Sequence, residues 1–242
     1  MMSSPERRFF FCHLQKTAGT TLIRRIRGDF PERAVYPLPT DGDPIARVIS
    51  VDNLLSVWAE RGDEIRVVTG HFPLCTAELL GGDFTTLTVL RHPLDRTVSY
   101  LRHHRRRTPE DADLTLEQVY DDEFRFHGLI NNHMTKMLSL TPAEMDDGAL
   151  TRVSFIPERL ERAKERLSAV DVVGIQEDFE SFCRELSERF GWSMADPLSP
   201  KPHTHGDLEP GFRDRILSDN ADDVELYEFA RRLVAERAPV ST

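Results

Sequence analysis

The chain has 242 residues, of which 39% are hydrophobic and 30% charged, and 31 basic against 41 acidic side chains give a formal net charge of −10. This length suits one sizeable α/β core rather than two full domains, so we expect a single domain over residues 1–242. The acidic balance argues against a nucleic-acid partner, because a general nucleic-acid binder usually has a basic surface.

The cysteines and the N-terminus indicate the compartment. Cys12, Cys75 and Cys183 are an odd number without a C-x-x-C pair, which indicates neither a disulfide framework nor a zinc site. After the charges at 6–8 only six apolar or near-apolar residues follow, too few for a signal peptide or a membrane span. We therefore expect a cytoplasmic protein without a membrane span, in a reducing environment.

Hydrophobic periodicity and turn residues predict strands that alternate with helices. In the first half we expect a strand at 8–14, a helix at 19–28, an irregular stretch with four prolines at 29–45, a strand at 46–50, a helix capped by Asp52, strands at 65–70 and 84–90, and a helix from Pro93. In the second half we expect helical blocks at 115–121, 125–138 and 157–169, a strand in "DVVGI", an amphipathic helix at 178–190, a loop at 191–210, and helices near 211–219 and 221–236.

This alternation is typical of an α/β protein whose parallel sheet is covered by helices on both faces. Ligands of such sheets bind beyond the carboxyl ends of the strands. The residues that follow each predicted strand are therefore the first candidates for a functional site.

The segment "FCHLQKTAGTTL" (11–22) joins the first predicted strand to a helix through small residues. Backbone N–H groups at a helix N-terminus attract anions, Ala18 and Gly19 leave room for a ligand, and Lys16 adds a positive charge. Hydroxyl donors would come from Thr17, Thr20 and Thr21. We therefore predict a phosphate-binding loop.

Two observations qualify this loop. The form G-x-x-x-x-G-K-[ST] would need glycine where the chain has Phe10 and Gln15. The simpler alternative, a capped helix start with a surface lysine, accounts for one threonine but not for the whole Lys-Thr-Ala-Gly-Thr-Thr run directly after a buried strand.

A second segment, "TVLRHPLDRTVSY", follows the predicted strand at 84–90. Arg91 stands where P-loop NTPases place the aspartate that handles magnesium. A guanidinium binds phosphate and repels a cation, so we expect no metal here. Arg91 and Ser99 could hold a phosphate that is not transferred, with Arg96 on the same helix face as Ser99. The alternative is that Arg91 pairs with a carboxylate such as Asp95.

The stretches "HLQKTAGTTL" and "VLRHPLDRTVSYLRHH" together resemble the sulfotransferases that use 3′-phosphoadenosine 5′-phosphosulfate (PAPS), in the branch of the heparan 2-O-type enzymes and many bacterial relatives. The resemblance implies a 5′-phosphosulfate loop in which Lys16 holds the bridging oxygen. It implies that Arg91 and Ser99 bind the 3′-phosphate. "VVTGHFPL" resembles the Gly-His segment of the family and puts His71 in the place of the catalytic histidine.

Other parts of the chain extend the resemblance. "NNHMTKML", "VGIQEDF" and "DDVELYEFARRL" resemble weaker landmarks of the family. In the family a late loop closes over PAPS, and "SPKPHTHG" (199–206) lies in that region, which implies roles for Lys201 and Thr204. Some heparan-type members carry two histidines around the Gly-His segment, whereas Thr69 precedes Gly70 here.

The sequence thus predicts a PAPS-dependent sulfotransferase that sulfates a hydroxyl-bearing acceptor, a carbohydrate or a small metabolite. His71 would be the general base and Lys16 would stabilise the leaving phosphate. Two alternatives stay open: a P-loop kinase, and a nucleotide-binding protein without catalysis. Residues 29–64 and 107–160 are expected to form the acceptor pocket, and the "RHHRRR" run (102–107) is interpreted as a solvated helix end.

Overall fold

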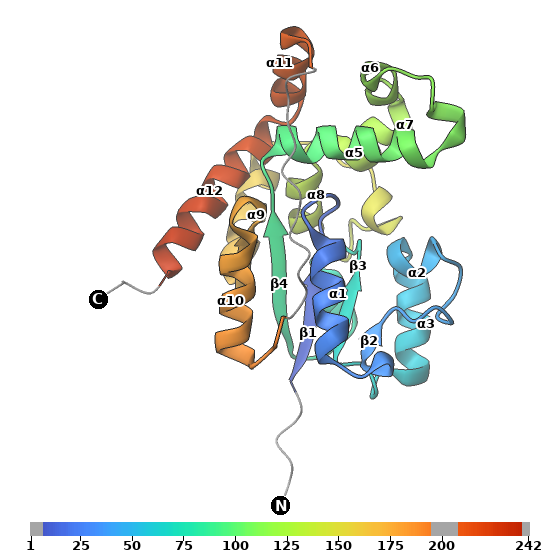
Figure 1. Ribbon diagram of the computed structural model, residues 1–242, viewed down its shortest axis with the longest axis vertical. Coiled ribbons are helices and arrows are strands. Elements are labelled where there is room, and N and C mark those ends of the chain that lie inside the picture. Colours follow the sequence, from blue (N-terminus) through green and yellow to red (C-terminus); the bar gives the residue numbers. More distant parts are fainter. Residues whose placement is uncertain (1–6, 195–207, 239–242) are drawn as a thin grey trace, which may run out of the picture.

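A five-stranded parallel sheet lies at the centre of the computed structural model, which describes residues 7–194 and 208–238 (Figure 1). Its strand order is β2-β3-β1-β4-β5. The strands are β1 (Arg8–Cys12), β2 (Val35–Tyr36), β3 (Val67–Gly70), β4 (Phe84–Leu90) and β5 (Val172–Ile175). The chain fills one side of β1 with β2 and β3 and then crosses to β4, so the order reverses at β1, where parallel sheets bind their ligands.

The central strand β1 is buried on both faces because its side chains alternate between two apolar clusters. Phe9 and Phe11 pack with residues of α1 (Gly19–Asp29) and α10 (Phe179–Phe190) on one face. Phe10 and Cys12 face the opposite side, where a larger cluster includes residues of α3 (Val51–Arg61), α8 (His133–Ser139), α9 (Pro157–Ala169) and α12 (Ala221–Arg237). The predicted parallel sheet covered on both faces is confirmed.

A third apolar cluster lies at the end of the sheet where β4 leads into α5 (Pro93–Arg107). Figure 1 shows α5 running across the carboxyl ends of the strands, with α6 (Leu116–Tyr120) and α11 (Pro210–Asp219) beside it. The cluster includes Leu94, Val98 and Leu101 of α5 with Phe212 and Ile216 of α11. This packing fixes α5 above the sheet edge that carries the predicted site.

The predicted strand at 46–50 is wrong, because these residues form the short helix α2 (Ala46–Ile49). The β-branched Val48 and Ile49 favoured a strand, but the Asp43 carboxylate accepts the N–H groups of Ile45 and Ala46 and starts a helical turn. None of the residues of α2 is buried, so burial against the sheet does not favour a strand here. Likewise, the N-cap of α3 is Ser50, whose hydroxyl accepts the N–H of Asn53, rather than Asp52.

The edge strand comes instead from the stretch predicted to be irregular. β2 has only two residues, Val35 and Tyr36, both buried and paired with Val67 and Val68. A strand of two residues next to prolines shows no periodicity that sequence reasoning could detect.

The helical block predicted at 125–138 is divided in the structure. It consists of the end of α7 (Glu123–Arg125), a π-helical turn η3 (Phe126–Ile130) and α8, with Asn132 in the left-handed region at φ 42°. The Asn132 side chain accepts the N–H of Asp223 at the start of α12, which holds the break in place. The remaining helix, α4 (Thr76–Leu79), follows β3.

Cys12, Cys75 and Cys183 are buried and free. Within the described ranges, no helix has the length and apolar character needed to cross a membrane.

Candidate functional site

The loop between β1 and α1 has a strained backbone. Lys16 and Ala18 both adopt left-handed conformations, with φ of 68° and 73°. Such conformations are uncommon for residues with a Cβ atom and gather at ligand-binding sites. Ala18 precedes the first residue of α1, so the loop ends at a helix N-terminus, where the helix dipole favours an anion.

The donors of this loop divide into two groups. The Thr17 side chain is fully buried, and its hydroxyl donates to the Leu14 carbonyl oxygen at 2.8 Å, so it holds the loop rather than facing outward. The N–H groups of Gly19 and Thr20 have no backbone acceptor in the described part of the chain. These two amides, at the first turn of α1, are among those available to a ligand.

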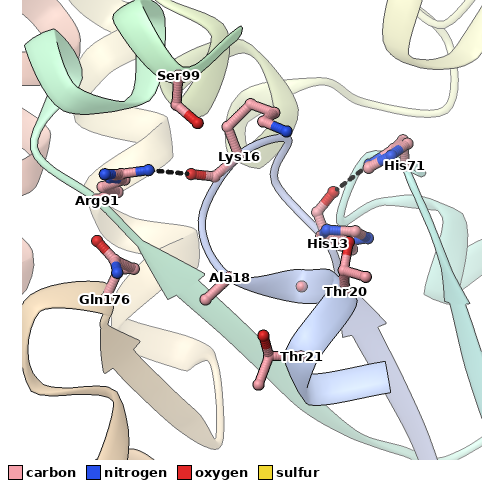
Figure 2. A pocket seen from close by; sticks show the side chains of 10 residues that line it. His13, Lys16, Ala18, Thr20, Thr21, His71, Arg91, Ser99 and Gln176 are labelled. Carbon is pink, nitrogen blue, oxygen red and sulfur yellow. Dashed lines mark hydrogen bonds between the residues drawn. The ribbon is translucent and has the colours of Figure 1, made fainter. Parts of the chain in front are cut away.

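A cavity of about 200 Å³ opens over this loop, at the carboxyl ends of β1, β3 and β4. Figure 2 shows its side chains converging from the loop, from α5 and from the strand ends. The lining residues are His13, Lys16, Ala18, Gly19, Thr20, Thr21, His71, Arg91, Ser99 and Gln176.

Arg91, which directly follows β4, contributes a positive charge to the lining of this cavity. Its side chain is 5% exposed, and Nη1 donates to the Lys16 carbonyl oxygen at 3.1 Å (Figure 2). Its Nε is buried and has no hydrogen-bond partner among the described residues. Burial lowers the pKa of Arg91, while the charges of Asp95 and Glu177 act in the opposite direction. A buried guanidinium with an unused donor is a favourable place for an anion.

Ser99 and Gln176 complete this side of the cavity. Ser99 lies two turns into α5 and is 6% exposed, while Gln176 directly follows β5. By contrast, Arg96 does not line the cavity: it is fully buried and donates to the carbonyl oxygens of Leu129 and Ile130. Arg96 therefore anchors α5 to the turn before α8.

His71 faces the cavity from the end of β3. Its Nδ1 lies 2.9 Å from the His13 carbonyl oxygen, and its backbone N–H donates to the Val48 carbonyl oxygen at 2.7 Å. Because a carbonyl oxygen can only accept, Nδ1 carries the proton in the neutral ring and Nε2 keeps a lone pair. Burial lowers the pKa of His71, and the hydrogen bond to His13 opposes this shift.

Gly70 makes this turn of the chain possible. Its φ is 149°, and a Cβ atom added there would lie 2.3 Å from the ring of Phe72. Only glycine fits between the strand end and this ring, and His71 follows directly.

His13 supplies a second imidazole from the end of β1. Its ring lies 4.2 Å from that of His71 between centroids and stacks on Phe11 at 5.2 Å. It also covers Gly19, where an added Cβ atom would lie 1.7 Å from Nε2 of His13. The two histidines therefore come from the ends of two strands, β1 and β3. They are not neighbours around the Gly-His segment, because Thr69 occupies the position before Gly70.

The cavity is strongly cationic. Burial, together with the charges of Arg106 and Arg91, lowers the pKa of Lys16 to about 8. Burial lowers the pKa of His103 to about 4, and the charge of Lys16 acts in the same direction. Ser99, His103 and Arg106 are four and three residues apart on α5 and so share the helix face above the loop. Arg106 forms no hydrogen bond or ion pair with any described residue.

The structure thus brings most of the predicted site residues together. Lys16, Ala18, Gly19, Thr20, Thr21, His71, Arg91 and Ser99 line one cavity. Lys201 and Thr204 lie outside the described residues.

Sequence reasoning assigned no chemical role to His13 and missed Gln176 and Arg106 at this site. The first two were detectable, because each follows a strand at the sheet edge where the site was expected. Arg106 belongs to the run that the sequence predicts to be a solvated helix end, although its spacing from Ser99 places it above the loop.

These residues fit a ligand with two separated anionic groups. One group would meet the amides of Gly19 and Thr20 with Lys16, and the other would meet Arg91 and Ser99. In residues 7–194 and 208–238, no three or more His, Cys, Asp or Glu side chains form a group that could hold a metal ion.

Two solved structures show what the chain is similar to. The crystal structure of a sulfotransferase from Alicyclobacillus acidocaldarius matches with a TM-score of 0.50 and 17% sequence identity, over 92% of this chain and 94% of that one. The crystal structure of the mouse sulfotransferase SULT7A1 complexed with PAP matches with a TM-score of 0.45 and 11% identity, over 99% of this chain and 70% of that one. The first likeness shows that the two chains share a fold.

No protein-family model matches the sequence. No curated protein sequence matches it either.

Proposed function

We propose that the protein is a sulfotransferase that moves the sulfuryl group of PAPS to the hydroxyl of an acceptor. The observation that carries the proposal is the joint cavity of the strained Lys16 loop and the buried Arg91 guanidinium. The fold shared with the Alicyclobacillus acidocaldarius sulfotransferase supports it. The sequence resemblance to the heparan 2-O-type branch stays a prediction.

The two anion sites suit the two ends of PAPS. The 5′-phosphosulfate would lie on the Lys16 loop, with donors from the Gly19 and Thr20 amides. The 3′-phosphate would meet Arg91, whose Nε has no other partner among the described residues, together with the Ser99 hydroxyl. Lys201 and Thr204 remain proposed contacts from the late loop.

His71 would take the proton of the acceptor hydroxyl. Its Nδ1–H is held by the His13 carbonyl oxygen, so the free Nε2 is the basic atom. The acceptor oxygen then forms its bond to sulfur while the bond from sulfur to the phosphate oxygen breaks. Lys16 and the loop amides stabilise the negative charge that grows on this oxygen.

The proposed reaction does not use a divalent metal. The position after β4 holds Arg91, which would repel a cation and can itself neutralise a phosphate. Turnover should therefore be the same with magnesium and with EDTA. Activity that EDTA abolishes and magnesium restores would favour the P-loop kinase instead.

The first experiment compares the thermal stability of the protein with adenosine 3′,5′-bisphosphate, adenosine 5′-phosphate, ADP and ATP. Loss of one charge-assisted contact costs about 2–5 kcal/mol, so the bisphosphate should stabilise the protein most. Ser99→Ala should reduce the difference in thermal stabilisation between the bisphosphate and adenosine 5′-phosphate. Ser168→Ala, on α9, should leave this difference unchanged. Equal shifts from all four nucleotides would contradict the proposal.

The second experiment measures sulfate transfer from PAPS directly. Release of adenosine 3′,5′-bisphosphate that depends on an added acceptor separates an enzyme from a nucleotide-binding protein without catalysis. Tight binding of the bisphosphate without any transfer across a panel of phenols, alcohols and sugars would favour that last alternative.

A further inference from the structure

A second cavity, of about 310 Å³, meets the first one at His13. Residues of α1, of the stretch around β2, of α2 and of the end of β3 line it, among them Ile23, Pro37, Val48 and Gly70. Its volume is near the lower limit of small-molecule sites, which span about 300–1,000 Å³. A ligand in this cavity would therefore be small and would contact His13, whose ring lies 4.2 Å from that of His71 between centroids.

Most of the wall is apolar, and the polar groups in it are largely occupied. Ile23, Pro37, Pro39 and Val48 supply aliphatic surface. The Thr69 hydroxyl donates to the Tyr36 carbonyl oxygen at 2.7 Å and so is not available. A sugar would lose more hydrogen bonds to water here than this wall can replace, which disfavours a carbohydrate.

Two arginines give the cavity its charge. Arg47 donates through Nη1 to the Pro39 carbonyl oxygen at 2.7 Å, and Arg27 donates through Nη2 to the Pro37 carbonyl oxygen. Both guanidiniums are thereby fixed in the wall, with further donors left over. Neither forms an ion pair with a carboxylate in the described ranges. Glu32 is the acidic residue of the lining, and it is exposed.

From these observations we infer that the second cavity holds the acceptor, and that the acceptor is a small, largely apolar hydroxy acid. Its carboxylate pairs with Arg47, Arg27 lies beside it, and its hydroxyl points to His71. This inference rests on the proposed function. The predicted range 29–64 supplies five lining residues, whereas 107–160 supplies none of those identified: Glu32, Pro37, Pro39, Arg47 and Val48.

The location of Val48 strengthens the link between this cavity and the chemistry. Val48 lines the cavity and its carbonyl oxygen accepts the backbone N–H of His71 at 2.7 Å. The wall that would contact the acceptor therefore also holds the proposed base in position.

The test uses three phenols of the same ring and hydroxyl: 4-hydroxyphenylacetate, neutral 4-ethylphenol and cationic tyramine, with methyl glucoside as the carbohydrate. Calorimetry measures their binding to the full protein with and without saturating adenosine 3′,5′-bisphosphate. The acid should bind at least about tenfold more tightly than 4-ethylphenol, because a hydrogen bond between charged groups contributes about tenfold or more to affinity. Tyramine and the glucoside should bind most weakly.

Arg47→Gln should reduce the preference for the acid to about threefold or less, and Arg47→Lys should retain part of it. Arg232→Gln, on the exposed surface of α12, is the matched control and should change nothing. Thermal unfolding of each variant shows whether it is folded, and Arg27→Gln provides a second, independent removal of charge.

The inference is overturned if the acid fails to bind, if 4-ethylphenol, tyramine or the glucoside binds as tightly, or if the preference survives in folded Arg47→Gln and Arg27→Gln proteins. Binding of the bisphosphate reports on the proposed function separately. If the bisphosphate does not bind but the acid is still selected through Arg47, the proposed function is wrong while the inferred carboxylate-binding pocket is supported.

Discussion

The imidazole rings of His13 and His71 lie 4.2 Å apart, at an angle of 40°. At this distance two charged rings would repel each other in a buried site, so at most one of the two rings is protonated to the imidazolium form. His13 is 7% exposed, and burial, with the charges of His71 and Lys16, holds its pKa well below the ordinary value. The Nδ1 of His71 is bonded to the His13 carbonyl oxygen and its Nε2 is left free, so His71 is the better base.

Removal of this base should separate chemistry from binding. His71→Ala should lower kcat by about 10²–10⁴-fold, the usual effect of losing a general base. The thermal shift produced by adenosine 3′,5′-bisphosphate should stay, because Lys16 and Arg91 are untouched. His127→Ala, at an exposed ring, is the control. If His71→Ala keeps near-normal turnover across the pH range, another group takes the proton, and His13→Ala is the next variant to assay.

Lys16 should act on the transition state more than on the bound donor. Its charge faces the oxygen on which negative charge develops, and interactions of this kind raise kcat selectively. Lys16→Ala should lower turnover by about two orders of magnitude or more, with a smaller loss of bisphosphate affinity in calorimetry. Lys164→Ala, which removes an ion pair between α9 and Glu225 of α12 away from the cavity, serves as the control. A Lys16→Ala protein that binds poorly but turns over normally at saturation would show that the role is binding alone.

The pH dependence of kcat/KM should be bell-shaped with limits from two groups. His71 accepts a proton only when neutral, and its pKa is lowered, so activity should fall as the pH drops through a value below 6.5. Lys16 stabilises charge only when protonated, and its pKa is about 8, so activity should fall as the pH rises through that value. Lys16→Arg should remove the alkaline limb. A limb that persists in this variant belongs to another group.

The sequence was informative where local pattern and tertiary structure agree. The buried strand Arg8–Cys12, the small residues after it and the arginine after β4 are all local signals, and parallel pairing then brings their ends to one edge. The edge strand β2 was not predictable, because two residues hold no period. The pairing of His13 with His71 was also not predictable, since it arises from β1 and β3 lying side by side.

Arg106 should be part of the donor site even though it is exposed. Its charge lowers the pKa of Lys16, so both act on the same place in the cavity. Arg106→Ala should weaken binding of adenosine 3′,5′-bisphosphate by about twofold to fivefold, an effect that high salt should remove because exposed charges are screened. It should also move the alkaline limb of the pH profile upward. Arg107→Ala removes the neighbouring charge and should do less. Equal effects of both variants would indicate that the summed positive charge of the helix end, and not Arg106 in particular, acts on the bisphosphate.

Gly19 should be required for two reasons: it leaves room for the ligand, and it leaves room for the ring of His13. A Cβ atom at Gly19 would lie 1.7 Å from Nε2 of His13, whose ring is held against Phe11. Gly19→Ala should therefore displace the ring, lower Tm and reduce turnover. Gly28→Ala, in the same helix and with nothing within 4 Å, should instead raise stability by about 0.5–1 kcal/mol, since alanine favours a helix. The decisive variant is the double mutant: His13→Ala gives the new methyl group room, so Gly19→Ala should cost clearly less stability in that background. Additive losses would show that the methyl group clashes with the backbone of the loop and not with His13.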